Sequence, residues 1–261
     1  MEVKPYVISG LRTRLNVDSN VSDGAHGDLG LDVKYGVTQN LTADLTFNPD
    51  FAQVEADEQQ VNLTRFSLFF PEKREFFLES QGIFNFGTGA RTGGFGRGGG
   101  SSSIGGSGRG GRGGAPVLFY SRGIGLQDGQ QVPIVAGGRL TGKVGSFDVG
   151  AVNIQTDGVP AVEAEPTNFT VLRLRRDLFS RSTVGVLFEN RTTSLVAADG
   201  ANQAWGMDGW FAFSDEAGLL GYYSRTRTDG MSGHDESYRG QFSYDADAWG
   251  GQMDHLVVGD N

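Results

Sequence analysis

The sequence contains no cysteine in its 261 residues. It therefore has no disulfide framework and no thiolate metal site. This absence does not fix the compartment, but it is compatible with an oxidising bacterial envelope. Histidine is scarce as well. His26, His234 and His255 fall in or near predicted loops or the chain end, with no HExxH motif and no other paired spacing, so we expect no metal centre on them.

Long apolar runs are also missing. No stretch approaches the roughly 20 residues that a transmembrane helix needs. The first residues, MEVKPYVISG, lack the basic and apolar regions of a signal peptide, so we expect an exported form of this chain to be a mature piece or a fragment. A formal net charge of −9 argues against nucleic acid as the main partner.

Nucleotide and nucleophile motifs are absent or out of place. Gly94, Gly96 and Gly99 spell GxGxxG inside a glycine-rich stretch, where no strand precedes and no helix follows. A GxxxxGK match ends at Lys143, but Val144 stands where a serine or threonine would hold magnesium. There is no GxSxG nucleophile elbow. The motifs therefore predict no catalytic residue, no metal ligand and no cofactor.

Glycine and phenylalanine, in contrast, are abundant. The chain has 42 glycines and 18 phenylalanines, while hydrophobic residues make up only 38%. This mixture is typical of an all-β protein with many turns. A regular alternation supports it: in residues 40–48, Leu41, Leu45 and Phe47 share one face and Asp44 lies on the other. The predicted strands cover residues 7–18, 28–36, 40–48, 116–123, 132–142, 146–155, 168–177, 182–190, 203–213, 218–227, 236–245 and 248–258.

The lengths of the connections favour one architecture. Most predicted strands have the roughly 9–11 residues that a tilted strand needs to cross a bilayer. From about residue 132, short turns alternate with longer loops. The tight turns lie near 143, at 179–181, at 214–216 and near 246, and the long loops at 156–166, 192–201 and 228–235. This rhythm is typical of an antiparallel up-and-down outer-membrane-type β-barrel, which we predict. A large soluble β-sheet protein is the alternative.

The side on which each turn lies tests the strand count. In an up-and-down barrel, the tight turn at 36–39 should lie on the same side as the later tight turns. With the strands predicted above, it does not. Either residues 49–115 contain one further crossing, or one predicted strand is wrong. VNLTRFSLFF and REFFLESQGIF are the candidates for a further crossing.

Residues 48–83 break the alternation. Within them, FFPEKREFFLES (69–80) gathers phenylalanines around five charged residues. A soluble core does not bury such charges without partners. A barrel lumen accommodates them, because the charges pair with inward arginines and lysines while the aromatic rings brace the wall. We predict that 48–83 is an inserted plug or constriction. Its candidate binding residues are Asp50, Glu55, Asp57, Glu72, Arg74 and Glu79.

Three other interpretations of this segment stay open. The most ordinary one is a salt-bridged, packed fold that binds no ligand. A second is calcium binding by the acidic residues of 50–58, although their spacing matches no EF-hand loop. A third is glycosidase chemistry, in which Glu72 and Glu79 would be the candidate carboxylates; any acidic chain offers such pairs.

Residues 87–114, GTGARTGGFGRGGGSSSIGGSGRGGRGG, form a low-complexity insert. Glycine at this density costs too much conformational entropy to order, so we predict a disordered loop. The two Arg-Gly-Gly triplets at 109–114 resemble RNA-binding repeats. A disordered loop in an acidic protein is the simpler interpretation.

Several stretches of the chain are familiar as a set: LDVKYGVTQNLTADLTFNPDFAQVEADEQQVNLTRFSLFFPEKREFFLE (31–79), LFYSRGIG (118–125), GGRLTGKVGSFDVGAVN (137–153), NFTVLRLRRDLFSRSTVGVLF (168–188), GMDGWFAF (206–213) and DHLVVGDN (254–261). In order and rough spacing, they resemble the bacterial family called domain of unknown function 5916. The resemblance covers nearly the whole chain.

The resemblance implies an outer-membrane, barrel-like region. In full-length members it usually follows a signal peptide and a family-9-like carbohydrate-binding β-sandwich, and such proteins are often labelled carbohydrate-binding or hydrolase. This chain lacks both, stops at Asn261 where members continue with further strands, and has a longer glycine-rich insert than expected. We therefore expect residues 1–261 to be one incomplete, unclosed barrel domain. The family brings no established catalytic residues.

Three functions follow as hypotheses. The first is an outer-membrane β-barrel segment in surface binding or transport, with outer-membrane lipid as partner and a link to carbohydrate through the missing module. The second is part of a carbohydrate-active hydrolase that uses carboxylates of 50–79. The third is a soluble β-protein that binds a ligand or calcium through its acidic loop.

Overall fold

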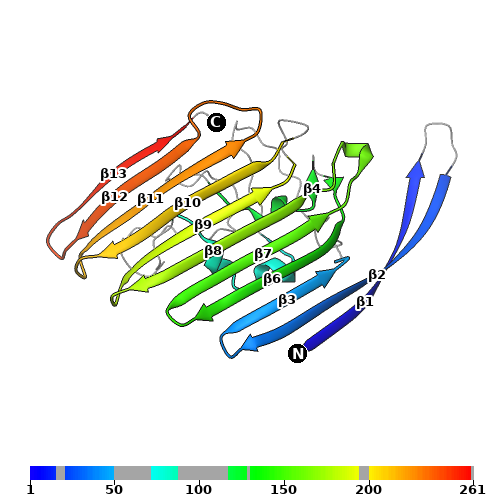
Figure 1. The fold of residues 1–261 in the computed structure, drawn as a ribbon, viewed down its shortest axis with the longest axis horizontal. Coiled ribbons are helices and arrows are strands. Elements are labelled where there is room, and N and C mark those ends of the chain that lie inside the picture. The colour runs from blue at the N-terminus through cyan, green and yellow to red at the C-terminus, as the bar shows by residue number, and fades with distance from the viewer. Residues whose placement is uncertain (16–20, 50–71, 88–116, 128–129, 194–199, 260–261) are drawn as a thin grey trace.

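The computed structural model describes residues 1–15, 21–49, 72–87, 117–127, 130–193 and 200–259. Eleven antiparallel strands form one open sheet, in which each strand pairs with its neighbours in chain order (Figure 1). They are β1 (Glu2–Leu15), β2 (Val21–Thr38), β3 (Leu41–Phe47), β6 (Ile134–Val144), β7 (Phe147–Thr156), β8 (Asn168–Leu178), β9 (Ser182–Arg191), β10 (Asn202–Ala212), β11 (Ala217–Thr228), β12 (Glu236–Asp245) and β13 (Gly250–Val258). β4 (Leu126–Gln127) and β5 (Gln130–Gln131) form a separate small hairpin.

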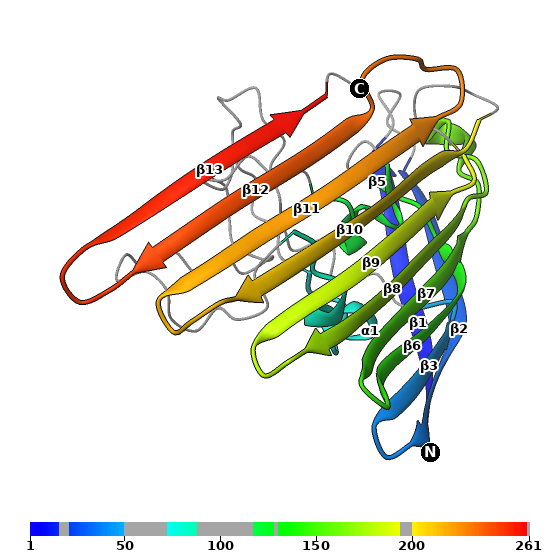
Figure 2. The ribbon, with the colours of Figure 1, turned by 60° about the vertical axis from the view of Figure 1, so that its left-hand side comes forward.

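The sheet is not closed, since β1 lies at one edge and β13 at the other. It curves into a trough with short helical segments on the concave side (Figure 2). We call the concave side the inner face and the convex side the outer face. The predicted all-β class, its antiparallel order and its unclosed sheet are confirmed.

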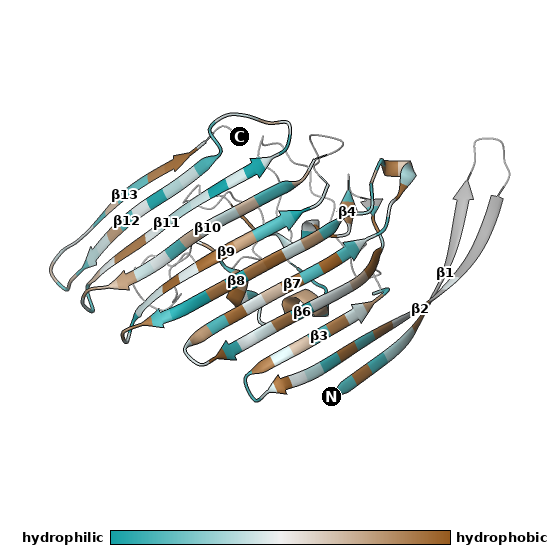
Figure 3. Ribbon diagram, in the orientation of Figure 1, coloured by the Kyte–Doolittle hydropathy of each residue, from teal (hydrophilic) through white to brown (hydrophobic). Residues whose placement is uncertain are grey.

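Side chains alternate between the two faces because successive residues of a strand point in opposite directions. On β8, Val171 and Arg173 face inward and are buried, whereas Leu172 and Leu174 face outward and are exposed. Figure 3 shows this alternation as bands of opposite hydropathy along the strands. The strand pattern read from the sequence therefore reflects two differently solvated faces.

The hydrophobic core lies on the inner face. It joins β6, β7 and β8 to residues 72–87 and 117–127, which lie across the trough. Its buried members are Phe77, Phe84, Ile124, Ile134, Val152, Ile154 and Val171. The sheet thus has a packed interior although it is open, because segments inserted between β3 and β6 cover part of its concave side.

The turns resolve the question of the strand count. β3 pairs directly with β6, with Thr42 opposite Thr141, so the chain crosses nowhere between them in the sheet. The tight turns after β2, β6, β8, β10 and β12 consequently lie along one side (Figure 1). The predicted strand at 116–123 is wrong: within its described part, residues 117–120 are irregular and Ser121–Gly123 form the 3-10 turn η2. Phe119 of this stretch packs on the core, but the described part of the stretch pairs with no strand of the sheet.

Helical structure in the described residues is short. α1 (Glu75–Leu78) and η1 (Gln81–Phe84) follow each other on the inner face, and Ser80 between them has a left-handed backbone with a φ of 54°. η3 (Pro160–Val162) lies in the loop after β7. No helix among the described residues has the length and apolarity to cross a membrane.

Candidate functional site

The candidate site is the inner face around residues 72–87, which we call the inner segment. It comprises residues 72–83 of the predicted plug and the four residues that follow them. The segment runs from Glu72 through α1 and η1 to Gly87, and it touches β7 and β8 through η1. Phe77 and Phe84 anchor it in the core, with 6% and 7% of their surface exposed.

A buried ion pair organises the start of the inner segment. The Arg74 guanidinium donates from Nε to Glu72 Oε1 at 2.9 Å and from Nη2 to Oε2 at 2.8 Å. Ser121 Oγ donates to Oε2 at 2.7 Å, and Arg74 Nη1 donates to the Ile124 carbonyl at 2.7 Å. The guanidinium also lies 4.3 Å from the centre of the Phe77 ring. The pair therefore ties the inner segment to residues 121–124.

Burial and pairing act on the Glu72 carboxyl in opposite directions. Burial raises its pKa, but the hydrogen bonds and charge of Arg74 outweigh burial and hold the pKa below its ordinary value. Glu72 is therefore a carboxylate at neutral pH, saturated with donors from Arg74, Ser121 and the backbone. Such a group serves as a structural anchor.

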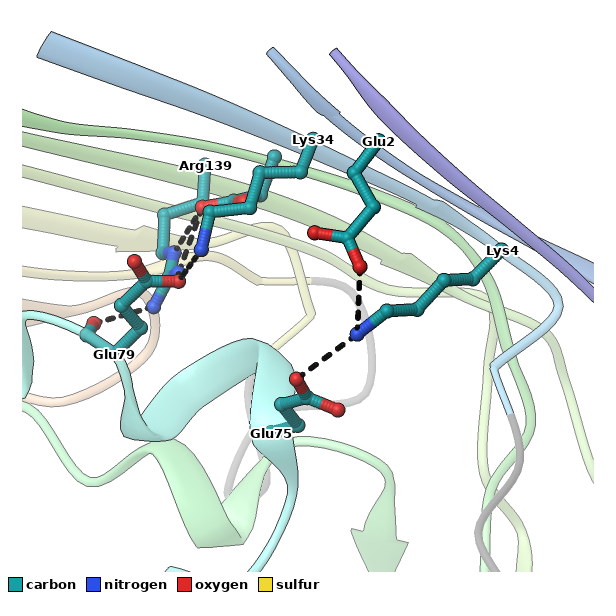
Figure 4. Close-up of polar contacts among 7 residues, drawn as sticks. Glu2, Lys4, Lys34, Glu75, Glu79 and Arg139 are labelled. Atoms are coloured by element: carbon teal, nitrogen blue, oxygen red, sulfur yellow. Dashed lines mark hydrogen bonds and ion pairs between the residues drawn. The ribbon is translucent and has the colours of Figure 1, made fainter. Parts of the chain in front are cut away.

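A second set of charges ties the inner segment to the strands of the sheet, which we call the wall (Figure 4). Glu75 accepts a bond from Lys4 of β1 at 3.2 Å, and Glu79 accepts one from Lys34 of β2. Arg139 of β6 donates to the Glu79 carbonyl and carboxylate. The hydrogen bond from Lys34, together with Arg139, lowers the pKa of Glu79.

Arg139 itself is buried, with 4% of its surface exposed. Its Nη2 lies 2.7 Å from Oδ2 of Asp44 on the neighbouring strand β3, and the pair is completed by a bond from Nε to the same oxygen. The guanidinium thus neutralises a wall carboxylate and holds the inner segment at once. Because all three of its nitrogens donate hydrogen bonds, Arg139 is held in a fixed position.

Arg173, like Arg139, links a carboxylate of the sheet to the inner segment, two strands further along the sheet. From β8 it reaches across β9 and forms a bidentate pair with Asp208 of β10, at 2.7 and 2.9 Å. Its Nε donates to the Ile83 carbonyl, and the Gly87 amide donates to Asp208 Oδ2 at 3.1 Å. The wall pair therefore also binds the end of the inner segment.

Wall glycines receive the aromatic rings of the inner segment. A β-carbon on Gly150 would lie 2.9 Å from Phe84, and one on Gly206 would lie 2.5 Å from Phe86. Real β-carbons do not approach other atoms so closely, so the rings occupy the space that any larger residue would fill. The strands of the wall are thus shaped to this segment.

A cavity of about 360 Å³ remains beside the inner segment. It lies between α1 and the strands β1 to β3, which form one end of the sheet. Its lining includes charged groups of Lys4, Asp32 and Glu75 and the apolar side chains of Phe76 and Ile154. A smaller space next to Phe84 and Tyr120 has a volume of about 30 Å³, close to that of one water molecule.

The structure places some of the predicted site residues and not others. Asp50, Glu55 and Asp57 lie outside the described residues, as do all residues of the predicted loop 87–114 except Gly87. Glu72 and Arg74 are brought together as one pair, while Glu79 faces the wall at Lys34 and Arg139. In the described part of the chain, no group of three or more His, Asp or Glu side chains is arranged to hold a metal ion.

Sequence reasoning missed the wall partners. They are Lys4, Lys34, Asp44, Arg139, Arg173 and Asp208. Each occupies an inward position in a strand whose outward positions are largely apolar, and that was the available signal. Inward arginine and lysine were expected in general terms, but no residue was assigned.

One comparison with known proteins gives a match. Residues 1–89 match the model of a family described as domain of unknown function (DUF5916). The predicted resemblance to this family is therefore confirmed over residues 1–89. The matched part includes β1, β2, β3 and the inner segment. The family model therefore spans three strands of the sheet together with the segment that lies on its inner face. No curated protein and no solved structure matches the chain.

Proposed function

We propose that this chain forms part of the wall of an outer-membrane β-barrel and serves transport or surface binding, with the inner segment as a built-in constriction. The observation that carries this proposal is that the outer face of the sheet is apolar and exposed, whereas its inner face holds buried charges. Outward residues such as Leu45, Val186 and Met207 are 58%, 49% and 55% exposed, while inward Arg139 and Arg173 are 4% and 2% exposed. A soluble protein does not expose so continuous an apolar surface, whereas lipid covers one.

Aromatic residues flank this apolar surface near both ends of the strands. At the tight-turn side, Phe179 and Trp249 are exposed at 92% and 67%, and towards the loop side Trp205 and Tyr238 are exposed at 40% each. On β10 the span from Trp205 to the turn residue Phe213 is eight residues (213 − 205). At about 3.4 Å per residue this is about 27 Å along the strand, or roughly 20 Å after a tilt of about 40°. That is comparable with the apolar band of about 25 Å in outer-membrane barrels.

The inner face supports the role of a constriction. The inner segment is held by ion pairs to β1, β2 and β6 and by Arg173 and Asp208 of β8 and β10. Such connections spread over the wall make the segment a fixed part of the lumen. A link to carbohydrate rests on the family resemblance alone.

The two other functions have less support. A glycosidase acid needs a raised pKa, whereas Glu72 and Glu79 have lowered pKa values and are occupied by basic partners. The acidic residues proposed for calcium lie outside the described part of the chain.

Electrophoretic migration of the full-length parent protein tests the proposal. The protein is extracted from isolated outer membranes in detergent, and boiled and unboiled samples are compared. We expect the unboiled form to migrate differently, because a closed barrel resists the detergent of the gel. Recovery of the protein in the soluble fraction, with no such shift, would overturn the proposal.

A further inference from the structure

The cavity beside α1 is large enough for a ligand. Its volume of about 360 Å³ falls within the range of roughly 300–1,000 Å³ that small-molecule sites occupy. Phe76, Phe77, Ile134 and Ile154 form an apolar floor, and polar groups from β1, β2 and α1 form its other side. An apolar cavity with a few converging polar groups is the ordinary form of a binding site.

The charges around the cavity favour one sign of ligand. The lining residues with their ion-pair partners comprise two cations, Lys4 and Arg74. Against them stand four carboxylates, Glu2, Asp32, Glu72 and Glu75, so the local balance is +2 − 4 = −2. Both cations are already engaged by carboxylates. A cationic ligand is therefore favoured over an anionic one.

Asp32 is the carboxylate that remains for a ligand. Thr46 Oγ1 donates to its Oδ1 at 2.6 Å. Among the described residues no cation forms an ion pair with Asp32, because Lys4, its partner across β1 and β2, turns to Glu2 and Glu75 instead. Thr46 fixes the carboxylate on the inner face, and the remaining oxygen lone pairs are available to a donor in the cavity.

We propose that this cavity binds a small organic cation. The ammonium or amidinium head lies on Asp32, and a compact apolar body lies on Phe76, Ile134 and Ile154. Aromatic rings favour a neighbouring cation as well, which adds to the attraction by the carboxylate. The described lining comes from β1 to β3, β6, β7 and α1, together with Pro49 and Arg74, and binding there does not depend on where the protein resides.

Three probes of equal shape and different charge test the site on the full-length protein. Benzylammonium, benzyl alcohol and benzoate are titrated into purified protein in detergent, and heats of binding are measured. We expect benzylammonium to bind at least about tenfold more tightly than benzyl alcohol, and benzoate not to bind. Equal binding of benzylammonium and benzyl alcohol would overturn the proposal, and this comparison needs no variant.

A substitution then assigns the binding to Asp32. Asp32→Asn should weaken benzylammonium binding by at least about tenfold, to the level of partition into detergent. Asp254→Asn is the matched control, because it removes an inward carboxylate from β13 at the opposite edge of the sheet and should leave binding unchanged. Binding that survives in Asp32→Asn would contradict the assignment.

Discussion

The ring of Phe84 lies so close to Gly150 that a β-carbon on the glycine would stand 2.9 Å from two of its atoms. Phe84 belongs to the inner segment and Gly150 to the wall strand β7. Their contact shows that the wall and the segment fit each other by shape as well as by charge. The fit rests on a residue without a side chain, so it is sensitive to the smallest substitution.

Gly150→Ala should therefore destabilise the protein. The added methyl group forces Phe84 or the strand to move, and overpacking of this kind costs about 1–3 kcal/mol. Gly240→Ala is the matched control, because a β-carbon there meets nothing within 4 Å. It should be neutral or slightly stabilising, since glycine weakens a strand. Unfolding of both variants in denaturant gives the comparison, and equal stabilities would contradict the fit.

Much of the sheet was predictable because it depends on local alternation. The period of two located β3 and the strands from β6 to β13, and the sides of the turns showed that the predicted set held either one strand too many or one too few. The stretch at 116–123 misled because Phe119 packs on the core and Ser121 and Arg122 are both buried in a segment whose described residues pair with no strand of the sheet. Only hydrogen-bonded pairing distinguishes the two cases, and pairing is not local.

The site was less predictable, for a physical reason. Gly150 and Gly206 lie in predicted strands, but nothing local indicated that they receive rings that are 66 and 120 residues away in the chain (150 − 84 and 206 − 86). Likewise, Arg173 and Asp208 meet only because β9 lies between their strands. Such contacts follow from register, which a single sequence does not state.

The buried pair of Glu72 and Arg74 yields a second prediction. Glu72→Gln leaves the guanidinium of Arg74 buried without its counter-charge, and breaking a buried pair in this way costs about 3–5 kcal/mol. Asp254→Asn removes the carboxylate charge from the more exposed ion pair with Arg239, and the free energy of unfolding should fall by at most about 1 kcal/mol. The free energy of unfolding in denaturant is the measurement. A loss for Glu72→Gln no larger than for Asp254→Asn would show that the pair does not anchor the segment.

Acid should loosen the inner segment. Glu72 and Glu79 both have pKa values below the ordinary 4.5 in the folded protein. A carboxyl group whose pKa is lower in the folded than in the unfolded state stabilises the fold above its unfolded pKa. That contribution is lost as the pH falls through the folded pKa.

The part of the free energy of unfolding that Glu72 and Glu79 contribute should therefore stay level from pH 7 to about pH 5 and fall as the pH drops below 4.5. The double variant Glu72→Gln, Glu79→Gln should start lower at pH 7 and fall less steeply. Denaturant unfolding at a series of pH values provides the test. An equally steep fall in the double variant would assign the acid sensitivity to other carboxyl groups.

A pair of methionines distinguishes a lipid-facing sheet from a soluble one. Met207 lies at the middle of β10 on the outer face, and Met231 lies in the loop after β11; they are 55% and 42% exposed. In water, replacing either by lysine should change stability little, because both side chains already meet solvent. In a bilayer, Met207→Lys places a charge inside the apolar band, two residues from Trp205, and should cost about 1–2 kcal/mol, between the interfacial and midplane values, while Met231→Lys should remain close to neutral. Unfolding of the full-length protein in lipid vesicles measures the difference, and equal stabilities of the two variants would argue against a membrane-embedded outer face.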